Sequence, residues 1–117
     1  MNPIFHIAYA RDWQRALLAG SYAVSTRGLS LAEQGYIHAS TAEQVASTAD
    51  RFYAGERDLV VLVIDPARVG VPIRFEPPAP GVAELFPHIY GPLDVAAVVG
   101  TRPLVAGPDG RFAFDAG

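Results

Sequence analysis

The sequence predicts an α+β domain, with two main helices in its first half and mostly strands in its second. Two segments, residues 10–19 and 45–53, carry apolar side chains at helical spacing. The run Leu59–Ile64 is continuously apolar and rich in β-branched residues, which is typical of a central strand buried on both faces. With 117 residues, 50% of them hydrophobic and 18% charged, residues 1–117 are predicted to form one domain with its own core.

The N-terminal part of the chain is predicted to be a strand followed by a helix. Residues 3–9 read as a short opening strand. In the helix over 10–19, Trp13 lies on the apolar stripe and is expected in the core. Gly20 stands where a C-terminal cap belongs, and a brief strand is predicted over 23–25.

A second helix is predicted from the pattern that opens it. Residues 30–34 look like one helical turn, and 36–39 look like a strand. Ser40 and Glu43 have the spacing of a capping box, in which the serine accepts from the third helical amide and the glutamate reaches back to the cap. The helix behind them is predicted to end at Gly55.

The second half is predicted to be strand and turn. In 71–76, Ile73 and Phe75 would share one face, and Arg74 and Glu76 would share the other, where a surface ion pair is the expected role. The remaining predicted elements are a loop over 77–81, an extended segment over 87–90, a strand over 94–99 and a terminal hairpin in which a turn at 108–110 joins 104–105 to 112–114.

Charge and composition exclude several classes of function. The net charge is −3 and the nine basic residues are scattered, so we expect no binding of extended nucleic acid. The absence of cysteine excludes disulfides, thiolate chemistry and cysteine-ligated zinc. No secretory signal is evident, and the longest apolar run is far too short to span a bilayer, so a cytoplasmic protein without membrane contact is expected.

Each of the three histidines lies in a segment suited to a site. His6 and His38 lie in strand-like apolar runs, and His88 shares one side of an extended segment with Tyr90. An ordinary pKa of about 6.5 allows a histidine to donate, accept or coordinate at neutral pH. Three histidines converging from distant parts of a small fold would make either a phosphate- or nucleotide-handling pocket or a metal site.

Ser40 and Thr41 follow His38 at the start of the predicted second helix. A helix N-terminus offers free amides and a partial positive charge, which suit a phosphate or another anion. The alternative is that these two hydroxyls only cap the helix.

Seven segments of the chain carry a recognisable pattern of residues. They are Phe5-His6-Ile7, Asp12-Trp13, 35–45, 51–55, Leu59–Ile64, Arg74-Phe75-Glu76 and 86–93. Across nearly the whole chain this pattern resembles a widespread uncharacterised bacterial family, catalogued as domain of unknown function 952.

The resemblance implies a fold like that of the ADP-ribosyltransferases, related to the RNA 2'-phosphotransferases: a split, mostly antiparallel sheet around a nicotinamide-dinucleotide cleft. In that superfamily a polar residue on the first strand holds a ribose or phosphate, and His6 matches its position. His38, with Ser40 and Thr41, matches a second motif on the nicotinamide side. The third motif usually supplies a catalytic Glu or Gln, whereas here it is His88-Ile89-Tyr90.

The missing carboxylate bears on the reaction that the resemblance implies. An oxocarbenium-like centre in transferred ADP-ribose would favour a carboxylate. Glu76 is the acid within a matching segment, and Glu84 is the other candidate. A phosphotransferase-like or purely ligand-binding role fits a histidine-rich cleft better than classical mono-ADP-ribosyl transfer does.

The leading hypothesis is a domain that binds a nucleotide, NAD or ADP-ribose-type ligand and acts as an ADP-ribosyl- or 2'-phosphotransferase-like enzyme. His6 and His38 would contact ribose or phosphate with help from Ser40 and Thr41, His88 would be the acid/base, and Tyr90 would line the pocket. One rival is a metal-binding module with His6, His38 and His88 as ligands. The other is a non-catalytic interaction domain, acting as a small homodimer.

Overall fold

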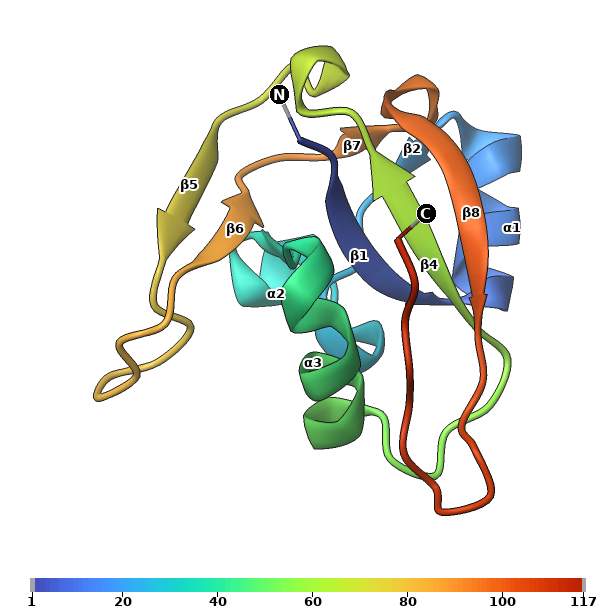
Figure 1. The fold of residues 1–117 in the computed structure, drawn as a ribbon. Coiled ribbons are helices and arrows are strands. Elements are labelled where there is room, and N and C mark those ends of the chain that lie inside the picture. The colour runs from blue at the N-terminus through green and yellow to red at the C-terminus, as the bar shows by residue number, and fades with distance from the viewer. Residues whose placement is uncertain (1, 117) are drawn as a thin grey trace.

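Strand β4 (Leu59–Ile64) is the central strand of the main sheet, as its apolar run predicts. In the computed structural model, which describes residues 2–116, β4 pairs antiparallel with β1 (Ile4–Tyr9) on one side and with β8 (Val98–Leu104) on the other (Figure 1). Pro103 lies on β8, an edge strand of this sheet, where a missing amide hydrogen is tolerated.

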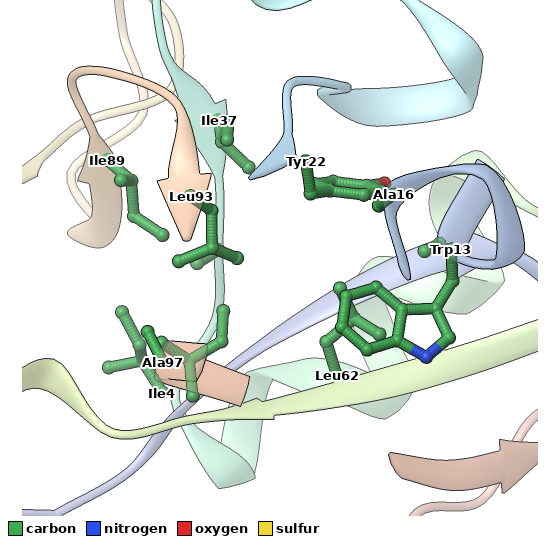
Figure 2. Packing of buried hydrophobic residues seen from close by; sticks show 12 residues of the cluster. Ile4, Trp13, Ala16, Tyr22, Ile37, Leu62, Ile89, Leu93 and Ala97 are labelled. Carbon is green, nitrogen blue, oxygen red and sulfur yellow. The ribbon is translucent and has the colours of Figure 1, made fainter. Parts of the chain in front are cut away.

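The two main helices pack on opposite faces of this sheet, because successive strand residues point to opposite sides. Helix α1 (Ala10–Ala19) buries Trp13 against Leu62 and its neighbours in one hydrophobic cluster (Figure 2). Helix α3 (Val45–Phe52) belongs to a second cluster, which includes Val61 of β4. The C-terminal segment, red in Figure 1, contributes to this second cluster through Phe112. The prediction that Trp13 is a core residue is confirmed.

A second antiparallel sheet contains two of the three histidines, His38 and His88, together with Glu76. Its strand order is β3 (Ile37–His38), β6 (Phe86–Ile89) and β5 (Ile73–Glu76). It joins the main sheet where Phe5 and Ser40 exchange backbone hydrogen bonds of 2.8 and 2.7 Å. The predicted mixed fold of antiparallel strands and few helices is therefore confirmed.

The remaining elements are short. Strand β2 (Ser21–Tyr22) pairs with β7 (Leu93–Asp94), and the single turn α2 (Leu31–Gln34) has a capping box formed by Ser30 and Glu33. The short 3-10 turns are Thr26–Gly28, Ala42–Gln44, Pro66–Arg68 and Val95–Ala97. Within residues 2–116, no helix has the length and apolar character needed to cross a membrane.

The capping prediction at Ser40 was wrong by one residue. Thr41 is the cap, and its backbone amide donates to Gln44 Oε1 at 2.9 Å. Ser40 does not serve, because its backbone is paired with Phe5 at the junction of the two sheets. The helix is also shorter than expected, since α3 ends at Phe52 rather than at Gly55.

Two predicted strands and the predicted hairpin differ from the structure. The strand over 94–99 is interrupted because the Asp94 carboxylate accepts the Ala96 amide at 2.8 Å and starts a 3-10 turn. The terminal hairpin has its turn, but only a single bridge, between Ala106 and Phe112, replaces the predicted strand pairing. The strand predicted over 23–25 lies instead at β2, with Val24 forming an isolated bridge.

Candidate functional site

The fold brings the three histidines to the junction of the two sheets. His6 lies on β1, His38 on β3 and His88 on β6. The register of β3 and β6 places His38 directly opposite His88, and the bridge at Ser40 brings β1 beside them. The predicted convergence of the histidines therefore has a backbone cause, since adjacent strands hold opposing residues a few ångströms apart.

Glu76, His88 and His38 form a continuous hydrogen-bonded chain. His88 Nδ1 lies 2.9 Å from Glu76 Oε1, and His88 Nε2 lies 3.2 Å from His38 Nδ1. The Tyr90 hydroxyl also donates to Glu76 Oε1. Hydrogen bonds from Tyr90 and then from His88 hold the pKa of Glu76 below its usual value, so this residue is a carboxylate. The chain thus runs from a carboxylate through two imidazoles.

Aromatic side chains hold the His88 ring in place. Tyr36 stacks on it with ring centroids 3.9 Å apart and planes 16° apart. Arg74 lies over the Tyr90 ring, with 5.2 Å between the guanidinium carbon and the ring centroid. The predicted surface ion pair between Arg74 and Glu76 is absent from the ion pairs of residues 2–116, because the Glu76 carboxylate instead faces His88 and Tyr90.

At the His38 end of this hydrogen-bonded chain, Nε2 of His38 is buried and has no hydrogen-bond partner among the described residues. Burial, followed by the neighbouring His88 and His6, lowers the pKa of His38 to about 4, so its ring is neutral at neutral pH. The ring lines a small hollow of about 10 Å³, together with Ser40 and Thr48. A space of this size accepts roughly one water molecule.

His38 also lines a larger cleft of about 200 Å³. The cleft combines a guanidinium, two hydroxyls and two aromatic rings with a carboxyl group. Beside His38 and Pro78, its lining residues are Arg51, Ser47, Thr48, Phe52, Phe86 and Glu84. Sequence reasoning did not select Arg51, Phe52 or Phe86 as site residues, although all three stood in the segments that carried the resemblance.

Gln44 is another residue that sequence reasoning missed. Its buried side-chain amide donates to Glu84 Oε2 at 3.0 Å and to the Leu85 carbonyl at 2.8 Å. Since Gln44 also accepts from Thr41, it fastens the loop before β6 to the start of α3. Glu84, one of the two candidate acids, lies in this loop and accepts from Gln44, whereas Glu76 hydrogen-bonds to His88.

His6 is fully engaged inside the protein. Its Nδ1 lies 2.7 Å from the His38 carbonyl and therefore donates, which leaves Nε2 to accept from the Tyr22 hydroxyl at 2.9 Å. Burial lowers the pKa of His6 to about 4. With both nitrogens bonded, His6 does not point an open nitrogen at the cleft. Across residues 2–116, no three His, Cys, Asp or Glu side chains are grouped as a metal ion would require.

The predicted anion-binding pair at the helix start, Ser40 and Thr41, does not line one site, because the two residues line separate hollows. Ser40 is buried and lines the small hollow beside His38. Thr41 lines a different hollow, with Phe5 and Phe75. Tyr90 lies beside His88, as predicted, but its hydroxyl is committed to Glu76. The structure thus brings His38, His88, Tyr90 and Ser40 together and leaves Thr41 apart.

Comparison with known proteins establishes the family. A family model described as "Protein of unknown function (DUF952)" matches residues 7–101. The chain belongs to the DUF952 family. This confirms the family resemblance drawn from the sequence segments. No match was found among curated proteins.

Two solved structures show that the DUF952 fold seen here is shared. A crystal structure of Protein CC0527 from Caulobacter crescentus has 28% sequence identity and a TM-score of 0.81, with 96% of this chain and 94% of that chain covered. A solution NMR structure of CC0527 has 31% identity and a TM-score of 0.77, with 95% and 91% covered. The chain is thus similar to CC0527 over almost the full length of both.

Proposed function

We propose that this DUF952 protein binds a nucleotide-type ligand, such as NAD or ADP-ribose, in the cleft beside His38, and that it is a transferase. The observation that carries the proposal is the cleft lining: Arg51, two hydroxyls and two aromatic rings beside His38, whose buried Nε2 has no hydrogen-bond partner among the described residues. The sequence resemblance implies an ADP-ribosyltransferase-like fold, and we include that superfamily in the proposal.

Each part of the cleft has a counterpart in a nucleotide. A guanidinium such as that of Arg51 binds phosphate oxygens with two parallel hydrogen bonds. Rings such as Phe52 and Phe86 offer surfaces on which a base stacks. The Thr48 hydroxyl can donate to a ribose or phosphate oxygen. The Ser47 hydroxyl donates to the Gln44 carbonyl at 3.2 Å, so it can accept from a ribose hydroxyl. His38, rather than His6, is the histidine in this proposal that meets the ligand, because both His6 nitrogens are bonded internally.

Ligand binding by wild-type protein and by Arg51→Gln tests the proposal. NAD, ADP-ribose and nucleotide 2'-phosphates are titrated calorimetrically and in a thermal-shift assay. We expect at least one to bind, and to stabilise the fold by about 2.7 kcal/mol at roughly 100 Kd. Loss of a charged hydrogen-bond partner costs about 1.5–3 kcal/mol, so Arg51→Gln should weaken binding roughly tenfold or more.

The matched control is Arg15→Gln. Arg15 is an exposed arginine on α1, on the opposite face of the main sheet from α3. It should leave the affinity unchanged. If none of the three ligand types binds wild-type protein, or if both variants weaken binding equally, the nucleotide cleft is refuted.

A further inference from the structure

We propose that Glu76 and His88 are positioning residues that make His38 Nε2 the proton acceptor of the cleft and that hold the resulting positive charge themselves. This inference deepens the proposed function and rests on it for the identity of the proton donor. The proton chain itself lies entirely within the protein. It also reassigns the acid/base role expected for His88 to His38, with His88 one step behind.

The tautomers of His88 and His38 follow from the Glu76 carboxylate, whose oxygens can accept a hydrogen bond but cannot donate one. Glu76 is a carboxylate, so His88 Nδ1 carries the hydrogen in their 2.9 Å contact. In a neutral His88 ring, Nε2 is then an acceptor. His38 Nδ1 must donate to it across 3.2 Å, which leaves the lone pair on His38 Nε2. Glu76, which is linked to His38 through the His88 ring, thereby determines that Nε2 is the basic nitrogen of His38.

Proton uptake at His38 can be passed along the same hydrogen bond. When His38 Nε2 accepts a proton, the hydrogen on His38 Nδ1 moves to His88 Nε2. His38 is then neutral again, with its hydrogen on Nε2, and His88 is an imidazolium ion. That cation lies 2.9 Å from the Glu76 carboxylate. One proton enters, one shifts, and the single added charge is paired.

The surroundings of the two rings favour this location for the charge. Burial and the neighbouring histidines disfavour a positive charge on His38. His88 instead has Glu76 against Nδ1 and Tyr36 stacked on its face. The other titratable or charged groups around the pair are Arg74 on β5, Tyr90 beside β6, His6 on β1, Arg51 on α3, Tyr53 after α3, and Glu84 in the loop before β6.

Nitrogen NMR of the ligand-free protein tests the proposal. The protein is labelled with ¹⁵N-histidine, and the three rings are assigned with His38→Gln and His88→Gln. In wild-type protein we expect acidification to turn His88 into an imidazolium ion while His38 stays neutral and changes from the Nδ1–H to the Nε2–H tautomer. If His38 instead carries hydrogen on both nitrogens after the first protonation, the proposal is wrong.

Glu76→Gln separates the charge of Glu76 from its hydrogen bonds, because the amide oxygen can still accept from His88 and Tyr90. An opposite charge within hydrogen-bond distance shifts a pKa by about 1–3 units. The pH midpoint for proton uptake by the histidine pair should therefore fall by about 1–3 units. Glu43→Gln, at an exposed carboxyl group before α3, is the control and should leave it in place. An unchanged midpoint in Glu76→Gln would overturn the inference.

Failure of this inference and failure of the proposed function are distinguishable. If nucleotide binds but the His38 tautomer does not change on acidification, nucleotide binding in the cleft is supported and the proposed proton transfer to His88 is wrong. If the tautomer changes as expected but no nucleotide binds, the proton transfer is supported and the proposed ligand is wrong.

Discussion

At the scale of single residues, the three histidines serve three different ends. His6 joins the two sheets, because its Nδ1 donates to the His38 carbonyl and its Nε2 accepts from Tyr22. His88 lies between a carboxylate and a second imidazole, and His38 has the nitrogen without a partner. Residue type alone does not separate these roles, since each follows from the atoms that surround the ring.

Burial of His6 predicts that the protein loses stability in mild acid. Its pKa is lowered from 6.5 to about 4 in the folded protein. Between these values the unfolded chain binds a proton that the folded protein does not, so the free energy of unfolding falls as the pH falls through this window. For a shift of this size the loss is on the order of 3 kcal/mol.

Urea denaturation from about pH 7 to about pH 4 measures this dependence. His6→Gln removes one of the two buried rings whose pKa is lowered to about 4, the other being His38, so it should reduce the slope, although the variant is less stable at neutral pH. Glu33 and Glu76 have lowered pKa values, so their contribution is lost at lower pH, as the pH falls below 4.5, their ordinary value. A wild-type stability independent of pH above about 4.5 would contradict the assignment.

At the scale of elements, the turn after β6 depends on a glycine. Gly91 has a φ of 157°, and a Cβ at this position would lie 2.6 Å from Val71 Cγ1. The preceding amide, that of Tyr90, donates to the Pro72 carbonyl at 2.9 Å. The close approach of these two segments holds the end of β6, and with it Tyr90, against the start of β5.

Gly91→Ala should therefore destabilise the protein, because an added methyl group forces Val71 or the turn to shift. Overpacking of this kind costs about 1–3 kcal/mol. The matched control is Gly100→Ala on β8, where an added Cβ meets nothing within 4 Å. Thermal unfolding of both variants decides the matter. Equal melting temperatures for the two variants would show that the close contact with Val71 does not make an added methyl group at position 91 destabilising.

At the scale of the whole molecule, β4 joins the two hydrophobic clusters into one unit. Leu62 and Ile64 point into the cluster under α1, while Leu59 and Val61 point into the cluster under α3. All four side chains are buried. A strand whose two faces each complete a core cannot leave one without disturbing the other, so we expect a single cooperative unfolding transition.

Leu62→Ala and Leu59→Ala test this coupling. Each removes a buried leucine from a different cluster and should cost about 2–5 kcal/mol. Trp13 is the single tryptophan of the chain and reports on the first cluster, while far-ultraviolet circular dichroism reports on the whole fold. Both signals should shift together in both variants. A Leu59→Ala transition seen by circular dichroism but not by Trp13 fluorescence would show two independent cores.

Sequence reasoning succeeded where the signal is local or carried by many residues. The β-branched run of β4, the stripe of α1 and the family pattern each involve neighbours along the chain, so they predict elements, core and family without tertiary information. Reasoning failed at Asp94 and Ser40, where one hydrogen bond or one bridge to a distant strand overrides the local preference.

By itself the sequence determined a mixed antiparallel fold of the DUF952 family with His6, His38 and His88 as candidate site residues. Only the tertiary structure decided that His38 and His88 pair across two strands, that Glu76 lies behind them, and that His6 faces inward. The reason is that strand register and the meeting of two sheets determine which side chains touch, and His38 and His88 are 50 residues apart in the sequence.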